Sequence, residues 1–260
     1  MPDKKPTKGW AVVTGASSGI GAVFARELAG RGYPVLAVAR RLERLEKLAR
    51  EAAEAGGRIE PLVADLKTEE GLSSVIMRIA DLGPIDLLVN NAGVAPSGDF
   101  LNDSLDKHLG AIRLNVDAVV TLTHAVLGGM VPRRGGAIIN VASVVAFQPF
   151  PHFAIYAATK AFVLSFTEAI AEELKGTGVR ILALCPGATK TEIDVFSDNK
   201  GLLGKLPSLT PQEVVKAALD ALETGRVVKV VGGLNFMLVF MNGFMPRSVV
   251  RWMMGVSVKS

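Results

Sequence analysis

Seven short apolar runs alternate with helix-length amphipathic segments along this chain, and this alternation limits the possible folds more than any other feature of the sequence. The runs are rich in Val, Ile and Leu and lack a regular polar alternation, which is typical of parallel strands buried on both faces. The predicted strands span residues 10–13, 35–39, 59–64, 85–90, 137–142, 179–184 and 227–231. The predicted helices span residues 19–30, 42–55, 69–80, 106–130, 155–175 and 211–224. With right-handed crossovers, this order predicts a doubly wound, three-layer α/β fold around a seven-stranded parallel sheet.

The chain has the size and composition of one α/β domain. Its 260 residues are 49% hydrophobic, which is ample for a large core, and no long Pro/Gly/Ser-rich or charged stretch divides them. Two pieces are less regular. Residues 188–210 leave the carboxyl end of the sixth predicted strand, where ligands of open α/β sheets lie, and are predicted to form a substrate lid. Residues 232–260 form a hydrophobic C-terminal tail.

Charge, cysteine and histidine content argue against several classes of function. The net charge is +4 and the basic residues are scattered instead of clustered with aromatics, so we expect no nucleic-acid binding. The single cysteine, Cys185, permits no intramolecular disulfide and follows an apolar run, so we expect a buried, unreactive thiol. The histidines lack the spacing of metal ligands, and no metal site is expected. Residues 1–8 hold no secretory signal, so we expect a cytoplasmic protein.

A glycine-rich turn joins the first predicted strand to the first predicted helix. Residues 14–21 read Thr-Gly-Ala-Ser-Ser-Gly-Ile-Gly, with the spacing G-x-x-x-G-x-G. Glycines let the backbone approach an anion closely, while the free N–H groups and the positive dipole end of the helix point at it. The turn is therefore predicted to hold a cofactor pyrophosphate, with an ordinary tight turn as the alternative. The predicted contacts are Gly15, Ser17, Ser18, Gly19, Ile20 and Gly21.

Two arginines follow the second predicted strand, where a dinucleotide-binding domain selects its cofactor. An acidic residue there would bind the adenosine ribose diol, but Arg40 and Arg41 occupy the place, and a guanidinium pairs well with a 2′-phosphate. The sequence thus favours NADP(H) over NAD(H). In the alternative interpretation, both arginines simply begin a solvated helix with Glu43 and Glu46.

A serine, a tyrosine and a lysine have the spacing of an acid–base site. Ser143 follows the fifth predicted strand, and Tyr156 precedes Lys160 by four residues, which places the phenol and the ammonium on one helix face. A nearby cation favours tyrosinate and lowers the pKa of the phenol. Tyr156 is therefore predicted to exchange a proton near neutral pH.

Together these motifs resemble the short-chain dehydrogenase/reductase family over residues 10–231. Besides the glycine turn, the matching residues are Asp65, Leu66, Asn90, Asn91, Ala92, Gly93, Asn115, Ser143, Tyr156, Lys160, Pro186, Gly187 and Thr191. The resemblance implies a Rossmann-type fold, a homodimer or homotetramer, and an NADP-preferring carbonyl reductase. It also implies that Asp65 contacts the adenine, that Asn91 braces the sheet and that Thr191 meets the nicotinamide carboxamide. The further cofactor-binding residues are Leu66, Ala92, Gly93, Tyr156, Lys160, Pro186, Gly187 and Thr189.

The reaction implied by the resemblance is hydride transfer between nicotinamide C4 and a substrate carbonyl carbon. Tyr156 protonates the developing alkoxide, and Ser143 donates a hydrogen bond to the same oxygen. Lys160 holds the nicotinamide ribose hydroxyls and stabilises tyrosinate. Asn115, within a helix, fixes a water that relays protons to bulk solvent.

Simpler interpretations are open for several residues and for the whole chain. Asp65 and Thr191 could cap helices, and Asn90 and Asn91 could be turn residues. The chain could be a non-catalytic NADP(H)-binding scaffold, an NAD-preferring alcohol dehydrogenase, or an isomerase or epimerase that recycles its nicotinamide. The combination of Ser143, Tyr156 and Lys160 argues against a scaffold, because a binding module would not require all three.

The segments expected around the substrate are mostly apolar and hold few charges that could clamp a carboxylate or phosphate. They span residues 94–100, 144–147, 150–153 and 193–206. This composition favours a hydrophobic ketone, aldehyde or secondary alcohol, such as a steroid, a fatty acyl-derived carbonyl or an aryl ketone.

The C-terminal tail is unusually apolar. Residues 236–241 are continuously hydrophobic, and five of the eight methionines lie in the tail. The apolar run is too short to span a bilayer. With Arg247, Arg251 and Trp252 nearby, the tail is predicted to lie on a membrane surface, to pack between subunits, or to complete the core of its own subunit.

Overall fold

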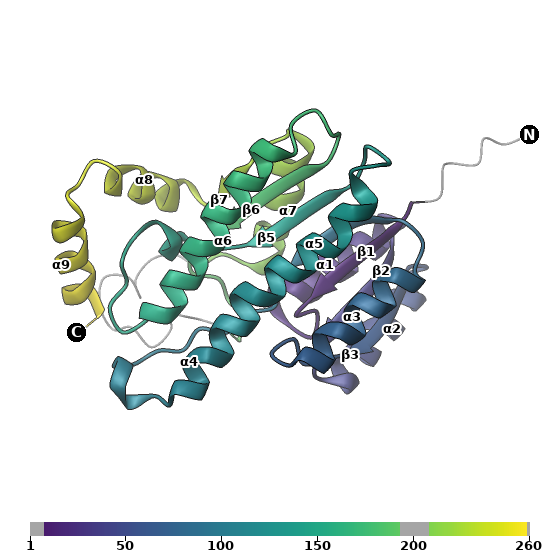
Figure 1. Cartoon of the computed structure of the whole chain (residues 1–260), viewed down its shortest axis with the longest axis horizontal. Helices are drawn as coiled ribbons and strands as arrows, with labels where there is room; N and C mark the ends of the chain where they lie inside the picture. Colours follow the sequence, from purple (N-terminus) through teal and green to yellow (C-terminus); the bar gives the residue numbers. More distant parts are fainter. Residues whose placement is uncertain (1–7, 193–207, 259–260) are drawn as a thin grey trace, which may run out of the picture.

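The structure is a computed structural model that describes residues 8–192 and 208–258 (Figure 1). The lid expected at residues 188–210 therefore lies largely outside the described residues. Its two described ends are tied together by a parallel bridge between Thr189 and Leu209. The Leu209 N–H donates to the Ala188 carbonyl at 2.8 Å, and the Lys190 N–H donates to the Leu209 carbonyl at 3.0 Å.

The seven predicted strands form one parallel sheet. They are β1 (Trp10–Thr14), β2 (Pro34–Ala39), β3 (Arg58–Val63), β4 (Ile85–Asn90), β5 (Ala137–Val141), β6 (Arg180–Cys185) and β7 (Val228–Val230). Their order across the sheet is β3-β2-β1-β4-β5-β6-β7. The chain builds outward from β1 to β3 and then returns to place β4 beside β1, so the strand order reverses between β1 and β4. In doubly wound sheets, ligands bind beyond the carboxyl ends of the strands at this reversal.

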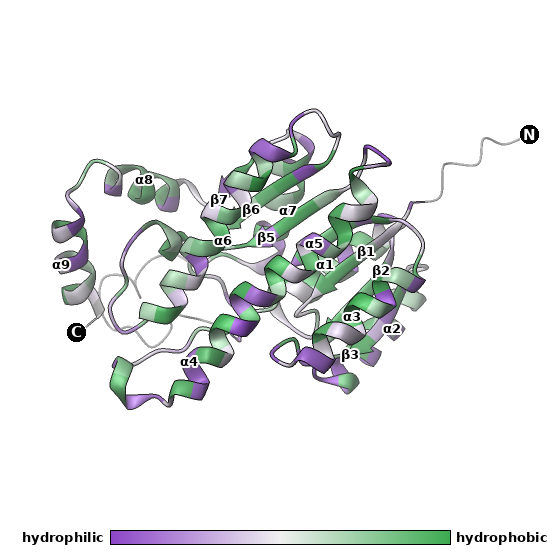
Figure 2. Cartoon of the chain, in the orientation of Figure 1, coloured by the Kyte–Doolittle hydropathy of each residue, from purple (hydrophilic) through white to green (hydrophobic). Residues whose placement is uncertain are grey.

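Helices cover both faces of the sheet and give the three layers that the sequence predicts (Figure 1). One face carries α1 (Gly19–Gly30), α2 (Leu42–Glu54) and α7 (Pro211–Glu223). The other face carries α3 (Glu69–Asp81), α5 (Ala118–Met130) and α6 (Ala154–Glu173). Along β1, Ala11 and Val13 pack into the core on the α1 side, while Val12 packs into the core on the opposite side. Because both sides of the strand are covered, the sequence shows a continuous apolar run, and the central strands are green in Figure 2.

The prediction that all seven strands are buried on both faces is wrong for the two edge strands, β3 and β7. In β3, Arg58 and Val63 are exposed and Glu60 and Pro61 are only half-buried, and every residue of β7 is half-buried. An edge strand has a neighbouring strand on one side only, and the helical layers cover it incompletely. Pro61 is tolerated here because an edge strand has backbone positions that need no ladder hydrogen bond.

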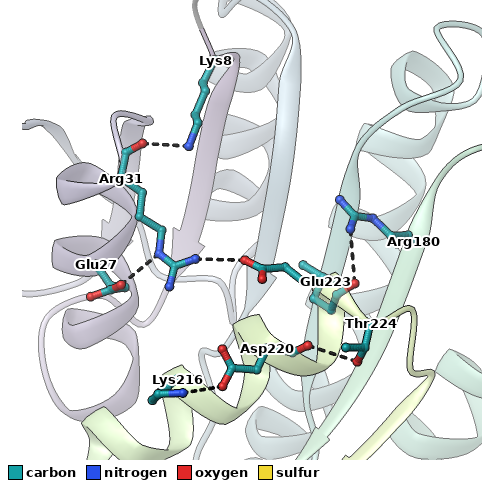
Figure 3. Close-up of polar contacts among 9 residues, drawn as sticks. Lys8, Glu27, Arg31, Arg180, Lys216, Asp220, Glu223 and Thr224 are labelled. Carbon is teal, nitrogen blue, oxygen red and sulfur yellow. Dashed lines mark hydrogen bonds and ion pairs between the residues drawn. The ribbon is translucent and has the colours of Figure 1, made fainter.

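Polar contacts join α1 to α7 at the edge of the sheet opposite the glycine turn (Figure 3). Arg31, directly after α1, pairs with Glu27 at 2.9 Å (Nε–Oε1) and with Glu223 of α7 at 3.3 Å (Nη1–Oε1). Lys8 Nζ donates to the Arg31 carbonyl at 2.8 Å. Such exposed ion pairs contribute about 0–1 kcal/mol each. The buried apolar side chains between α1, α7 and the sheet therefore stabilise this face far more than the network does.

Two helices, α8 (Gly233–Asn242) and α9 (Arg247–Val258), follow β7. Figure 1 shows them at the end of the long axis opposite β3. Within the described residues, two other segments, Leu105–Met130 and Ala154–Glu173, reach the length and mean hydropathy of a membrane-spanning helix. Both pack on the sheet as core helices, so their apolar character is explained by burial in the protein.

Candidate active site

The glycine turn lies between β1 and α1, and its glycines are required on steric grounds. Gly15 has φ of +66°, a left-handed conformation that favours glycine. A Cβ on Gly21 would lie 2.3 Å from the Gly15 carbonyl oxygen and 2.5 Å from Asn91 Nδ2. The first turn of α1 thus packs directly on the glycine turn, and Gly19 and Ile20 at the helix start line the pocket described below.

Thr14 and Asn91 hold the glycine turn against the end of β4. Thr14 Oγ1 accepts hydrogen bonds from the backbone N–H groups of Asn91 and Ala92, both at 3.0 Å. The same hydroxyl donates to the Val89 carbonyl at 3.3 Å. Asn91 Nδ2 donates to the Thr14 carbonyl at 2.9 Å. Asn91 therefore braces β1 against the segment after β4, at the point where the strand order reverses.

Arg41 points at the glycine turn. It precedes α2 as the N-cap residue, yet its Nη2 donates to Ser17 Oγ at 2.8 Å and to Ser18 Oγ at 3.0 Å. This position differs from the solvated-helix alternative, in which the side chain would lie along α2. Arg40 is more exposed, and its Nη1 lies 3.9 Å from Asp65 Oδ2.

Asp65 does not cap the following helix as its simpler alternative role would require. The N-cap of α3 is Thr68, whose Oγ1 accepts a hydrogen bond from the Gly71 N–H at 3.0 Å. Asp65 Oδ1 instead accepts from the Lys67 N–H at 3.0 Å, in a turn that directs the carboxylate toward Arg40. Asp65 thus stands beside the arginine pair that follows β2.

Glu192 is a pocket residue that sequence reasoning missed. Its carboxylate pairs with Arg41 at 2.9 Å (Nη1–Oε2) and with Arg44, and it accepts a hydrogen bond from Ser18 Oγ at 3.0 Å. Hydrogen bonds from Arg44 and Arg41 lower the pKa of Glu192 to about 2. Because 148 residues separate Glu192 from Arg44, no local pattern could have revealed the contact.

The helix expected over residues 106–130 forms as the continuous helical segment Leu105–Met130, but the sequence did not predict the π-helical turn within it. The turn, Arg113–Asp117, separates α4 (Leu105–Ile112) from α5. Within it, Asn115 is buried, and its Oδ1 accepts from the Val94 N–H at 3.0 Å. Asn115 Nδ2 donates to the Val94 carbonyl at 2.9 Å and to Thr159 Oγ1 at 3.0 Å. The side chain thus holds the segment after β4 against α6, and π turns of this kind are frequent at functional sites.

Ser143, Tyr156 and Lys160 meet on the opposite wall of the same pocket. Ser143 caps the short 3₁₀ helix η3 (Val144–Phe147) directly beyond β5, and its Oγ accepts from the Val145 N–H at 3.3 Å. Tyr156 and Lys160 lie one turn apart near the start of α6. All three residues are buried. Burial of polar side chains costs free energy unless they are hydrogen-bonded, and a cluster of three at one wall is therefore a candidate functional site.

The sequence-based expectation for the Tyr156 pKa is wrong in this structure. Burial raises the pKa of Tyr156 to about 12, and a hydrogen bond with Ser143 opposes this only in part. Lys160 Nζ donates to the Val141 carbonyl at 2.7 Å and lies 5.8 Å from the centroid of the Tyr156 ring. The ammonium group is therefore hydrogen-bonded to the backbone of β5. Burial also lowers the pKa of Lys160 to about 8. A cation four residues away favours ionisation of the phenol, but the loss of water around the buried ring has the larger effect on its pKa.

These groups surround one cavity of about 390 Å³ at the carboxyl edge of the sheet. All residues predicted for the site line it except Gly21 and Asn115, which lie behind the lining and support Gly15 and Val94. Val38, whose role the sequence did not suggest, also lines it. The cavity has the size of a small-molecule site, roughly 300–1,000 Å³.

Cys185 takes the role expected from the sequence. It is fully buried at the end of β6, and burial raises the pKa of its thiol to about 12. A protonated thiol without solvent contact is a poor nucleophile. The residue therefore packs as a small hydrophobic side chain between β6 and α6.

A doubly wound parallel sheet with a glycine turn at its order reversal defines a Rossmann-type dinucleotide-binding fold. The family model for short chain dehydrogenases matches residues 9–200. The chain belongs to the short-chain dehydrogenase/reductase family of oxidoreductases.

Relatives and solved structures agree with this membership. A short chain dehydrogenase of Pseudocercospora fijiensis is 39% identical over 202 residues, which cover 76% of this chain and 65%, just under two thirds, of the fungal protein. Human 17-beta-hydroxysteroid dehydrogenase type 3 is 36% identical over 220 residues, which cover 83% of this chain and 69% of the human protein. A solved short-chain dehydrogenase from Sphingobium yanoikuyae in complex with NADPH superposes with a TM-score of 0.80 at 34% identity, covering 92% of this chain and 96% of that one.

Proposed function

We propose that this oxidoreductase uses NADP(H) to interconvert a hydrophobic ketone or aldehyde and the corresponding alcohol. The observation that carries the proposal is the placement of Ser143, Tyr156 and Lys160 on the wall of the same cavity that holds the glycine turn and Arg41. A scaffold that only binds a nucleotide has no use for three buried polar groups opposite the phosphate cradle.

The glycine turn fits the diphosphate of a dinucleotide. A side chain on Gly15 or Gly21 would collide with Asn91 Nδ2 or with the turn itself, so the backbone alone faces the cradle. The Ser18 side chain makes no capping hydrogen bond to α1, which leaves the first N–H groups of the helix for an anion.

Ser17, Ser18 and Arg41 fit a 2′-phosphate, because two hydroxyls and a guanidinium gather at one point. The NADPH in the Sphingobium relative supports this cofactor. The further residues proposed to hold the cofactor are Arg40, Asp65, Leu66, Ala92, Gly93, Lys160, Pro186, Gly187, Thr189 and Thr191. When bound, the nicotinamide supplies the hydride for reduction and accepts it for oxidation.

The chain's own residues supply the proton chemistry in this proposal. Burial holds the pKa of Tyr156 at about 12, so the phenol is protonated at neutral pH and can donate its proton to a substrate carbonyl oxygen. Ser143 Oγ donates a hydrogen bond to the same oxygen and orients it. Lys160, held by the Val141 carbonyl, binds the ribose hydroxyls of the cofactor. Asn115 holds the Val94 backbone against α6. Its predicted role of fixing a water that relays protons to bulk solvent is part of the same proposal.

An apolar wall supports a hydrophobic substrate. Tyr156 packs in a cluster with Val145 and Phe150, and Phe153 and Met254 complete it. The relationship to a human hydroxysteroid dehydrogenase supports a steroid-like or similarly bulky carbonyl compound. The expected contribution of residues 193–206 lies outside the described residues. A cytoplasmic location and a dimeric or tetrameric state are part of the same proposal.

A panel of ketones, aldehydes and secondary alcohols, followed through the absorbance of NADPH and NADH, tests the proposed function. We expect turnover with bulky apolar carbonyl compounds and a higher kcat/KM with NADPH than with NADH. Turnover that prefers NADH would contradict the cofactor assignment and favour an NAD-preferring alcohol dehydrogenase. Binding of NADPH without turnover of any compound would favour the scaffold.

Glu192→Gln should tighten NADPH binding by about threefold and leave NADH binding unchanged. In the structure the Glu192 carboxylate occupies Arg41 and Ser18, the groups proposed for the 2′-phosphate, so an anionic phosphate must displace it. The magnitude follows from an exposed ion pair of about 0.2–1 kcal/mol. Fluorescence titration of both cofactors measures the effect. Glu43→Gln, an exposed carboxylate on α2, is the matched control, and an equal change for both cofactors would contradict the competition.

A further inference from the structure

The last two helices and the turn between them carry more than half of the exposed large apolar side chains among the described residues. Of 20 such side chains, eleven lie between residues 234 and 256. They are Leu234, Phe236, Met237, Leu238, Phe240, Met241, Phe244, Val249, Trp252, Met253 and Val256, here called the apolar face. Soluble proteins rarely expose apolar side chains at this density unless the surface binds something.

The polar residues of α8 face the protein. Asn235 Nδ2 donates to the Val231 carbonyl at 2.8 Å, and Asn242 bonds to the Gln148 side chain beyond η3. Apart from these two asparagines, the residues of α8 are apolar or glycine. The helix therefore has its amphipathic pattern reversed, with amides inward and hydrocarbon outward. Its ribbon is mainly green in Figure 2, because most of its residues are hydrophobic.

A row of phenylalanines runs along the outer side of α8 and past its end. The ring centroids of Phe236 and Phe240 are 6.4 Å apart, and those of Phe240 and Phe244 are 5.0 Å apart. Each of the three residues is more than half exposed, at 59%, 59% and 77%. Apolar area in contact with water is unfavourable, so a nonaqueous cover would stabilise this face.

The outer side of α9 continues the apolar face. The spacing of Val249, Trp252, Met253 and Val256 places them on one side of the helix, and all four are exposed. The other side contacts the protein, where Val250 is buried and Met254 packs on the cluster that contains Tyr156. The apolar face therefore adjoins the wall of the candidate active site.

The charges of this region favour an anionic cover. No acidic residue follows Glu223 in the sequence, while Arg247 and Arg251 on α9 are exposed. A second copy of the chain seated on the apolar face by twofold symmetry would bring two positively charged regions close together, with no acidic partner from these helices. A bilayer that contains anionic lipids offers an apolar layer together with negative headgroups. At 10 and 12 residues, the helices are too short to span it.

We propose that the apolar face of α8 and α9 docks on the surface of an anionic lipid bilayer. The phenylalanine row and Trp252 enter the boundary between headgroups and acyl chains. Arg247 and Arg251 lie on the other side of α9, outside the apolar face, and their long side chains extend to the headgroup phosphates. This docking does not depend on the proposed reaction, because it is a property of the surface alone. Its consequence is that the wall beside Tyr156 lies close to the lipid.

Flotation of the full chain with lipid vesicles tests the docking. We expect the protein to float with vesicles of phosphatidylcholine and phosphatidylglycerol, to float less with phosphatidylcholine alone, and to lose binding as salt increases. The chain has two tryptophans, so in a Trp10→Phe background the emission reports Trp252. This emission should shift to shorter wavelength when anionic vesicles are added.

Two matched pairs of variants separate the apolar and the charged contributions. The double variant Phe240→Ser with Trp252→Ser should weaken vesicle binding by at least about tenfold. Met77→Ser with Leu101→Ser, which alters apolar residues elsewhere that are at least as exposed, should leave it unchanged. Arg251→Glu should remove most of the preference for anionic lipid, whereas Arg50→Glu on α2 should not.

Three outcomes would overturn the proposal. One is a protein that stays unbound with both vesicle types while Trp252 emission does not move. Another is equal binding to neutral and anionic vesicles, which would remove the role of the arginines. The third is an oligomer that ignores vesicles and that the Phe240→Ser, Trp252→Ser variant dissociates, which would assign the face to a second copy of the chain.

Discussion

Tyr156→Phe is expected to lower kcat for carbonyl reduction by about 10²–10⁴-fold, the range typical for the loss of a positioned proton donor. The substitution removes only the hydroxyl. The ring keeps its place in the cluster with Val145 and Phe150, so the pocket wall and the glycine turn should be undisturbed. NADPH binding should therefore stay at the wild-type level. Steady-state kinetics with the best substrate of the panel, together with fluorescence titration of NADPH, measure the two quantities separately.

The second tyrosine of the chain provides the matched control. Tyr33 lies between α1 and β2, away from the pocket, so Tyr33→Phe should leave kcat unchanged. In the same Tyr33→Phe protein without cofactor, tyrosinate absorbance reports Tyr156 alone and should rise only toward pH 12. Near-normal turnover by Tyr156→Phe would show that another group donates the proton. Ionisation of Tyr156 near neutral pH would show that burial does not govern this phenol.

Gly21→Ala should lower NADPH affinity by about tenfold or more and reduce the free energy of unfolding by about 1–3 kcal/mol. The new Cβ would lie 2.3 Å from the Gly15 carbonyl oxygen, and backbone atoms cannot move aside cheaply. To relieve this clash, α1 must shift away from the glycine turn. The shift disturbs the hydrogen bond from Asn91 Nδ2 to the Gly15 carbonyl and widens the site proposed for the cofactor diphosphate. Isothermal titration of NADPH and chemical denaturation followed by circular dichroism measure the two effects.

Gly30→Ala is the control for this prediction, because Gly30 lies on the same helix and a Cβ there would meet no atom within 4 Å. Alanine favours helix over glycine by about 0.5–1 kcal/mol, so stability should stay level or rise slightly, with NADPH affinity unchanged. If both variants bind NADPH as the wild type does, the cradle does not depend on the close packing at Gly21.

The elements predicted best are those whose sequence pattern reports local surroundings. The α1 helix has the predicted bounds because it buries its apolar residues at helical spacing. The β4 strand has them as well, because it is a short, nearly continuously buried apolar run. The π-helical turn around Asn115 escaped prediction, since one extra residue in a turn leaves the apolar pattern of the flanking helices nearly unchanged. The partial exposure of β3 escaped it too, because a strand's position at the sheet edge depends on the order in which distant strands pair.

The candidate site divides in the same way between local and distant causes. The sequence by itself determined the glycine turn, the arginine pair after β2 and the one-turn spacing of Tyr156 and Lys160, because each is a relation between near neighbours on the chain. Only the tertiary structure decided the surroundings of these groups. It brought Glu192 onto Arg41 and Arg44, turned the asparagines of α8 inward, and buried Tyr156 so that its pKa rises instead of falling. The packing of the crossover helices on the sheet decides which distant segments meet and which side chains lose contact with water. Neither the contacts nor the resulting pKa shifts follow from the spacing of residues along the chain.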